Sequence, residues 1–227
     1  MRLRRRARIV DGSDVLSEIL DHPGPTDTLF DVLAACMAAL SPGPSVAMLG
    51  FAGGGVVAPL RAMGFSPRLE AVDISRQGEA LFRELCGTWA GQIDVTQADA
   101  AAWLRHRKKR YHLILEDLST SGDAVSVKPD ISLETLPRLI RRRLTPDGVA
   151  VTNLIPVPGM SWTPLLERMA SPFASAHVVH VSEYVNKILI AGDALGSARD
   201  VSRRVRESLY RIGSFQATGI SIRSLRP

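Results

Sequence analysis

The stretch that decides the fold reads Ser45-Val-Ala-Met-Leu-Gly-Phe-Ala-Gly-Gly-Gly55. Its apolar run, ending at Gly50, predicts a short buried strand, and the glycines that follow predict a tight turn whose backbone a ligand can approach closely. Apolar residues continue through Leu60 and Met63 and stop at Gly64, which predicts a helix. The unit is therefore strand, glycine turn, helix. Alone it is weak support for a binding site, because many glycine clusters are only turns.

Strands and helices alternate around this unit. The expected helices are 26–40, 79–85, 100–106 and 132–143, the last with Pro137 as a misfit, and the expected strands are 69–72, 93–97, 111–115 and 149–155. Parallel neighbours need a crossover connection, so the alternation predicts a doubly wound α/β fold with helices on both faces of the sheet.

The last two strands differ from the others. Only five residues separate 177–181 from 187–191, too few for a crossover, so these strands must pair as an antiparallel hairpin. We therefore expect a mostly parallel, seven-stranded sheet that ends in an antiparallel hairpin. This arrangement is typical of the class I methyltransferase-like Rossmann folds.

Length and composition suit one globular domain with short appendages. The chain has 227 residues, 45% apolar and 22% charged, and its two cysteines favour a reducing, cytoplasmic compartment. Prolines and glycine at 42–44 interrupt the uncharged stretch 32–60, so we expect no membrane span. The expected division is a short basic segment over 1–25, the main α/β domain over 26–195, and a basic helix and tail over 196–227, with the helix at 197–212.

The positive charge lies at the ends of the chain. The net charge is +5, but residues 1–8 hold five arginines and 199–227 hold seven against two acids, which leaves 16 basic and 21 acidic residues in 9–198. Proteins that bind phosphate backbones usually carry the basic face on the folded domain, so nucleic acid is not an expected partner. Basic tails that are solvated, or that pack on a partner subunit, are the simpler interpretation.

Ligands of open α/β sheets bind at the carboxyl ends of the strands. There the glycine turn would contact a nucleoside, Asp73 would accept from ribose hydroxyls, Asp99 from an adenine amino group, and Asp117 would lie where a reacting group sits. Each acid has a structural alternative: Asp73 and Asp99 could cap the next helix, and backbone amides could satisfy Asp117. The candidate nucleoside-binding residues are Gly50, Phe51, Gly53, Gly54, Asp73, Ile74, Asp99 and Ala100, and the candidate catalytic acid is Asp117.

A dinucleotide site is the natural competitor. It too combines a glycine turn with an acid about twenty residues later. Counted from Gly50, however, its G-x-G-x-x-G pattern needs a glycine at position 52, where this chain has Ala52. Asp99 and the terminal hairpin also have no role in such a site.

With these residues in hand, the chain resembles the spermidine synthase family, and more closely its shortened relatives, over residues 26–192. The matching segments are Val46-Ala-Met-Leu-Gly-Phe-Ala-Gly-Gly-Gly55, Glu70-Ala-Val-Asp73, Gln97-Ala-Asp99-Ala100, Tyr111-His-Leu-Ile-Leu-Glu-Asp117, Leu144-Thr-Pro-Asp-Gly-Val-Ala-Val-Thr-Asn153 and Asn186-Lys-Ile-Leu-Ile-Ala191. The resemblance implies that Gly50 and its neighbours line the nucleoside, that Asp73 binds the ribose and Asp99 the adenine, and that Asp117 faces the incoming amine. It also suggests a homodimer.

The chain departs from the family pattern at two acids. Gly53 stands where the family usually has an aspartate in the glycine turn, and Thr120 stands where it has a second acid three residues after Asp117. Both anchors for amines are therefore missing, although Asp123 or Glu116 could substitute. The N-terminal strand domain of the family is also reduced to about 25 residues.

These observations predict a transferase that binds S-adenosylmethionine or its decarboxylated form and passes an aminopropyl or methyl group to a small acceptor. Asp117 would steer the acceptor and accept its proton, and would suit a weakly basic acceptor at least as well as a diamine. The alternatives are a methyltransferase proper and a catalytically inert nucleoside-binding paralogue. We expect no metal, because the five histidines form no cluster with ligand spacing.

Overall fold

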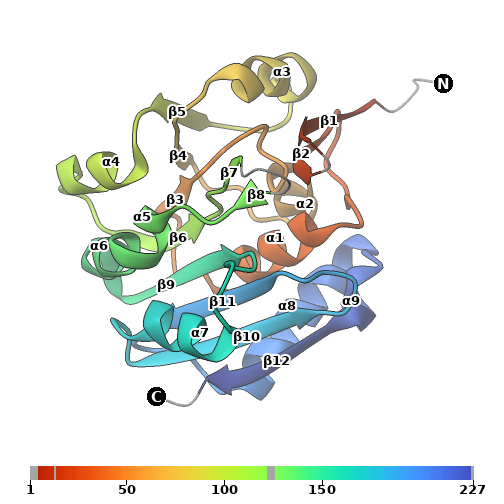
Figure 1. Ribbon diagram of the computed structural model, residues 1–227. Helices are drawn as coiled ribbons and strands as arrows, with labels where there is room; N and C mark the ends of the chain where they lie inside the picture. The colour runs from red at the N-terminus through yellow and green to blue at the C-terminus, as the bar shows by residue number, and fades with distance from the viewer. Residues whose placement is uncertain (1–4, 13, 122–125, 226–227) are drawn as a thin grey trace.

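In the computed structural model, which describes residues 5–12, 14–121 and 126–225, eight strands form the main sheet (Figure 1). They are β3 (Val46–Leu49), β4 (Leu69–Asp73), β5 (Ile93–Gln97), β6 (Tyr111–Glu116), β9 (Leu144–Leu154), β10 (Ser175–Val181), β11 (Lys187–Gly192) and β12 (Ile220–Leu225). Their order across the sheet is β12-β10-β11-β9-β6-β3-β4-β5. Strands β5, β4, β3, β6 and β9 are parallel neighbours, and β11, β10 and β12 pair antiparallel.

The predicted fold class is confirmed, including the antiparallel hairpin of β10 and β11. The expected number of seven strands is one too few. Residues Ile220–Leu225, which the sequence predicts to be part of a tail, form β12 and pair along β10 from Ala176 to Val181. Without this pairing β10 would expose an unpaired edge, and edge strands are usually covered or paired in folded proteins.

Helices cover both faces of the sheet (Figure 1). One face carries α1 (Leu29–Leu40), α2 (Val57–Ala62), α3 (Gln77–Cys86) and α8 (Ala198–Ile212), and the other carries α4 (Ala100–His106), α5 (Asp130–Glu134), α6 (Leu136–Arg143) and α7 (Trp162–Ala170). Strand β3 shows why its whole run is apolar. Val46 and Met48 enter the first core and Ala47 and Leu49 enter the second, so neither face meets water.

Local signals account for several helix ends. Helix α8 begins after Ser197, whose hydroxyl accepts from the backbone N–H of Asp200, and ends at Gly213 in the left-handed conformation, as predicted. The helix expected over 132–143 is instead two helices that meet at Thr135, and Pro137 lies in the first turn of α6, where proline is tolerated. The short α9 (Gln216–Gly219) follows α8.

Two small hairpins lie at the carboxyl edge of the sheet. The first pairs β1 (Arg6–Asp11) with β2 (Asp14–Leu20), within the N-terminal segment that we expected to be only short and basic. The second pairs β7 (Thr120–Ser121) with β8 (Ser126–Val127) and follows β6. They meet where Ser126 donates its backbone N–H to the Asp14 carboxylate. Figure 1 shows β7 and β8 beside β2. The N-terminal strands therefore cover part of the edge at which ligands of this fold class bind.

Across the described ranges, no helix combines the length and the apolar character that crossing a bilayer requires.

Candidate functional site

Asp73 fastens the glycine turn. Its Oδ2 accepts hydrogen bonds from the backbone N–H groups of Phe51 and Ala52, both at 2.8 Å, and its Oδ1 accepts from the backbone N–H of Ser75 at 2.9 Å. The Phe51 side chain is buried and packs edge-on against Phe82, with ring centroids 5.2 Å apart, so only its backbone lies at the turn. Asp73 remains partly exposed, and a carboxylate has about four lone-pair sites, so it retains capacity for a hydroxyl donor.

The edge beyond Asp73 is open. Ile74 is 78% exposed, and its backbone carbonyl accepts from Gln97 Nε2 at 3.1 Å. Asp99 is exposed and caps α4, because its Oδ1 accepts from the backbone N–H of Ala102 at 2.8 Å, while its Oδ2 has no partner among the described residues. The side chain of Ala100 is buried in the core, so only its backbone can face a ligand. Asp73, Ile74 and Asp99 thus combine two partly used carboxylates with an apolar surface between them.

Asp117 follows the carboxyl end of β6, which lies two strands away from β4 in the sheet. Its Oδ1 accepts from Asn153 Nδ2 at 2.8 Å, and Asn153 Oδ1 accepts in turn from Asn186 Nδ2 at 3.0 Å. A Cβ on Gly50 would come within 2.5 Å of the Asp117 carbonyl oxygen, so only glycine allows this approach. Desolvation raises the pKa of Asp117, and the hydrogen bond from Asn153 and the charge of Lys128 offset part of that rise.

Asn153 and Asn186 support the candidate acid, although the sequence shows them only as members of segments that match the resembling family. Asn153 lies near the carboxyl end of β9, and Asn186 directly precedes β11. A polar side chain near the end of an apolar strand, or directly before one, is the signal that could have found them.

Glu116 does not substitute for a missing amine anchor. Its Oε1 accepts from Lys128 Nζ at 2.9 Å, from Ser132 Oγ at 3.0 Å and from the backbone N–H of Leu118 at 3.0 Å. The side chains of Glu116 and Lys128 are each 1% exposed, and Lys128 also donates to the Leu118 carbonyl oxygen at 2.9 Å. A buried internal ammonium therefore already pairs with Oε1, while the buried Oε2 has no partner among the described residues. Asp123, the other candidate, lies outside the described residues.

The glycine turn is covered at Gly53. A Cβ there would meet Ile19 Cδ1 at 2.6 Å and Ile9 Cδ1 at 2.7 Å, so the hairpin of β1 and β2 fills the space that a side chain would need. Gly54 is enclosed in the same way by the rings of Phe51 and Phe82. Thr120, the second position at which an acid is missing, is exposed on β7.

The candidate residues share one edge. In the order β5, β4, β3 and β6, the strand ends are followed by or finish with Asp99, Asp73, the glycine turn and Asp117. Three strand spacings of about 4.8 Å give this row a span of roughly 14 Å. It offers carboxylates to hydroxyl and amino donors at one end and an amide-supported carboxyl group at the other.

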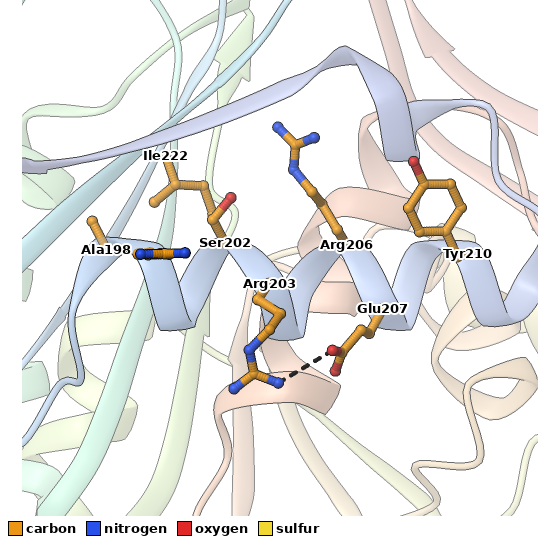
Figure 2. A pocket seen from close by; sticks show the side chains of 8 residues that line it. Ala198, Ser202, Arg203, Arg206, Glu207, Tyr210 and Ile222 are labelled. Carbon is orange, nitrogen blue, oxygen red and sulfur yellow. Dashed lines mark hydrogen bonds and ion pairs between the residues drawn. The ribbon is translucent and has the colours of Figure 1, made fainter.

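A separate hollow lies along α8, next to β12 (Figure 2). It has a volume of about 580 Å³ and is lined by Arg199, Arg203, Arg206 and Tyr210 with neighbouring residues of α8 and Ile222 of β12. Figure 2 shows Arg203 paired with Glu207, at 3.2 Å. None of the candidate site residues lines this hollow. Within the described ranges, no three or more His, Cys, Asp and Glu side chains are grouped so that they could hold a metal ion.

Comparison with known proteins finds likeness only in structure. No family model matches the chain. No curated protein matches its sequence. Among solved structures, a probable spermidine synthase from Corynebacterium glutamicum matches with a TM-score of 0.71 and 16% identity, over 93% of this chain and 80% of that one.

Two further solved structures are similar. Human methyltransferase-like protein 13 in complex with SAH has a TM-score of 0.61 at 18% identity, over 80% of this chain and 88% of that one. A spermidine synthase in complex with the transition-state analogue AdoDATO has a TM-score of 0.62 at 16% identity, over 77% of this chain and 64% of that one. At these identities the comparisons establish the fold, which is the class I methyltransferase-like Rossmann fold.

Proposed function

We propose, on the premise of a class I methyltransferase-like fold, that the chain is a transferase that binds S-adenosylmethionine or its decarboxylated form and passes a methyl or aminopropyl group to a small acceptor. The observation that carries the proposal is the row of strand ends from Asp99 through Asp73 to Asp117. Open α/β sheets bind their ligands at this edge.

The open half of the row fits an adenosine. Asp73 holds the glycine turn with backbone hydrogen bonds and keeps acceptor capacity for the ribose hydroxyls. The exposed Ile74 offers an apolar surface to a flat base, and Oδ2 of Asp99, which has no partner among the described residues, accepts from an amino group. Small-molecule sites combine apolar surface with a few polar groups that fix the orientation of the ligand.

Asp117 would act on the acceptor. A sulfonium donor, when bound, supplies an electrophilic carbon beside a positive sulfur. Asn153 orients Asp117 through Oδ1, which leaves Oδ2 without a partner in the described part of the chain and free to accept a proton from an acceptor group. The pKa of Asp117 is raised toward neutral pH, and a general base works best when its pKa lies near the working pH.

Calorimetry with both sulfonium compounds tests the proposal. We expect the unmodified protein to bind at least one of them and Asp73→Ala to lose binding, because that change removes the ribose acceptor and releases the glycine turn. Asp94→Ala is the matched control, since Asp94 lies on β5 but pairs on the surface with Arg68. If neither compound binds the unmodified protein, the proposal fails.

A catalytically inert nucleoside-binding protein is the second candidate. The packing of Ile9 and Ile19 against Gly53 favours it, because this cover narrows access to the glycine turn. The two candidates separate when a bound donor is offered a panel of amines, hydroxyls and thiols. Release of the demethylated or dealkylated thioether with any acceptor supports transfer, and binding without turnover supports the inert alternative.

A further inference from the structure

A second hollow lies at the ends of three neighbouring strands. It has a volume of about 280 Å³ and is lined by Val178 and His180 of β10, Lys187 of β11, and Ser221 and Arg223 of β12. None of the candidate site residues lines it, and none of the described residues that line it is acidic. We call it the strand-end hollow.

The register of the strands gathers the polar side chains of this hollow. His180 pairs with Lys187 across to β11 and with Ser221 across to β12, and Arg223 pairs with Val178. Side chains of directly opposed residues lie on the same face with Cβ atoms about 4.5–5.5 Å apart, and residues two apart along a strand share a face. The sheet itself therefore makes neighbours of four polar side chains.

These side chains offer hydrogen-bond donors in excess. Lys187 Nζ donates to His180 Nδ1 at 2.6 Å, which requires a neutral ring with its hydrogen on Nε2. An ammonium group has three donors and a guanidinium five, and neither accepts a hydrogen bond. Among the described residues, the Arg223 guanidinium has no hydrogen-bond or ion-pair partner. Most of the donors in the strand-end hollow are therefore unused.

The hollow also keeps two like charges near each other. Desolvation and the charge of Arg223 both lower the pKa of Lys187, and no carboxylate of the described residues opposes them. The Lys187 Nζ lies 5.7 Å from the centroid of the Trp162 ring at the start of α7, a cation–π distance that holds the ammonium in place. Like charges on neighbouring strands cost stability unless an anion lies between them.

Protection of a sheet edge does not explain this charge. Charged side chains on an outermost strand hinder pairing with other molecules, and Arg223 on β12 has such a position. Lys187 and His180, however, lie on β11 and β10, each of which has a neighbouring strand on both sides. Their side chains guard no free edge, so a ligand accounts better for their position.

We propose that the strand-end hollow binds a phosphate group, either as the free ion or on a small phosphorylated molecule. A phosphate monoester carries a charge of about −1.5 to −2 at pH 7 and three acceptor oxygens, which match two fixed cations and donors from three strands. The Arg223 guanidinium supplies two parallel hydrogen bonds, and Lys187, His180 Nε2 and Ser221 Oγ supply single ones. A carboxylate, with one charge and two oxygens, would leave more of these donors unused.

This inference does not depend on the proposed function, because the hollow shares no residue with the candidate site. Phosphate binding is measured without a nucleoside, so its failure and the failure of the proposed function are separate results.

Calorimetry at low ionic strength tests the proposal, since salt screens exposed charges. Inorganic phosphate and glycerol 3-phosphate are titrated into the unmodified protein, Lys187→Gln, Arg223→Gln and Arg199→Gln. Arg199 is the matched control, because it is an exposed arginine that lines the other hollow beside β12 and has no partner among the described residues. We expect Lys187→Gln and Arg223→Gln to weaken phosphate binding by about tenfold or more, and Arg199→Gln to change it by less than about twofold.

The two titrants separate the sources of the phosphate group. Glycerol 3-phosphate that binds at least as tightly as inorganic phosphate identifies a phosphorylated molecule as the ligand, and binding of inorganic phosphate alone identifies the free ion. Either result supports the inference when the losses are confined to Lys187→Gln and Arg223→Gln. Equal losses in all three variants, or no binding at millimolar phosphate, would overturn it.

A single-stranded oligonucleotide is the third titrant. If it binds while phosphate does not, and Arg199→Gln weakens it as much as Lys187→Gln, the basic surface around β12 is a polynucleotide face and the inference is wrong. If a glutamine variant does not fold, amide NMR spectra of the unmodified protein decide. Phosphate-induced shifts confined to His180, Lys187, Ser221, Arg223 and their chain neighbours support the inference, and shifts elsewhere, or none, overturn it.

Discussion

Asp73 holds Ala52 in a left-handed backbone conformation. The Asp73 Oδ2 accepts from the Ala52 backbone N–H at 2.8 Å, and Ala52 has a φ of +44°, which costs a residue with a side chain about 1–2 kcal/mol. The strained residue lies at the position where a dinucleotide site would need glycine. A hydrogen bond from a side chain on another strand thus stabilises this backbone conformation, which glycine would adopt without such support.

Gly78 is required by the same turn. A Cβ on Gly78 would lie 1.8 Å from the Ala52 carbonyl oxygen, a backbone atom that cannot move without the turn. We expect Gly78→Ala to lower the free energy of unfolding by about 3 kcal/mol, or the melting temperature by roughly 6–12 °C. Gly196→Ala is the control, because a Cβ there has only an ordinary contact at 3.9 Å. Equal melting temperatures for the two variants would contradict the prediction.

Placing an acid at position 53 should not by itself create an amine site. In Gly53→Asp the new side chain would collide with Ile19 and Ile9, so we expect a lower melting temperature and no binding of putrescine. Adding Ile9→Ala to Gly53→Asp should recover part of the stability, because it removes one of the two colliding groups. Thermal melts and calorimetry check both steps. A single variant as stable as the unmodified protein would show that the hairpin moves freely.

Removing Lys128 should leave an unpaired buried charge. Because Lys128 neutralises Glu116 in the core, Lys128→Met is expected to destabilise the fold by about 3–5 kcal/mol. Combining it with Glu116→Leu should restore most of this loss, since two apolar groups replace the pair. Denaturant unfolding of the single and double variants measures the coupling. Additive effects of the two changes would contradict the ion pair.

The carboxyl group of Asp117 should reduce stability at neutral pH. Its pKa is raised in the folded protein, so folding favours the protonated form, and the stability present below the unfolded pKa near 3.8 is lost as the pH rises through the folded pKa. Asp117→Asn keeps an acceptor for Asn153 without the charge. We expect it to melt higher than the unmodified protein at pH 7, with a difference that shrinks as the pH falls toward 3.8. A difference that grows toward acid pH would show the opposite sign.

Serine at position 99 should separate capping from ligand binding. Serine caps helices about as well as aspartate, so Asp99→Ser is expected to keep the melting temperature while weakening nucleoside binding by about tenfold. Asp99→Ala should lose both, including about 1 kcal/mol of stability. Melting curves and calorimetry on the same samples distinguish the roles. If Asp99→Ser binds nucleosides normally, Asp99 only caps α4.

The amino-acid sequence predicts the structure correctly where the signals are local. The helix predicted over 100–106 has those bounds in the structure, and the five residues between 181 and 187 required the observed hairpin. It did not predict α7, which follows a stretch rich in proline and glycine, or β12, a short alternating run that becomes a strand only beside β10. The sequence predicts the acids at the strand ends, but it does not predict the buried ion pair between Lys128 and Glu116.

The alternation of strands and helices from β3 to β6, and the placement of Asp73, Asp99 and Asp117 at one edge of the sheet, follow from the sequence alone. Apolar periodicity and connection length act between near neighbours, and parallel strands bring their carboxyl ends together. The packing of β1 and β2 over Gly53, and the burial of Glu18 between Arg6 and Arg8, appear only in the folded protein. These features depend on contacts between distant segments, such as Asp14 with Ser126 across 112 residues, whose partners no local pattern specifies.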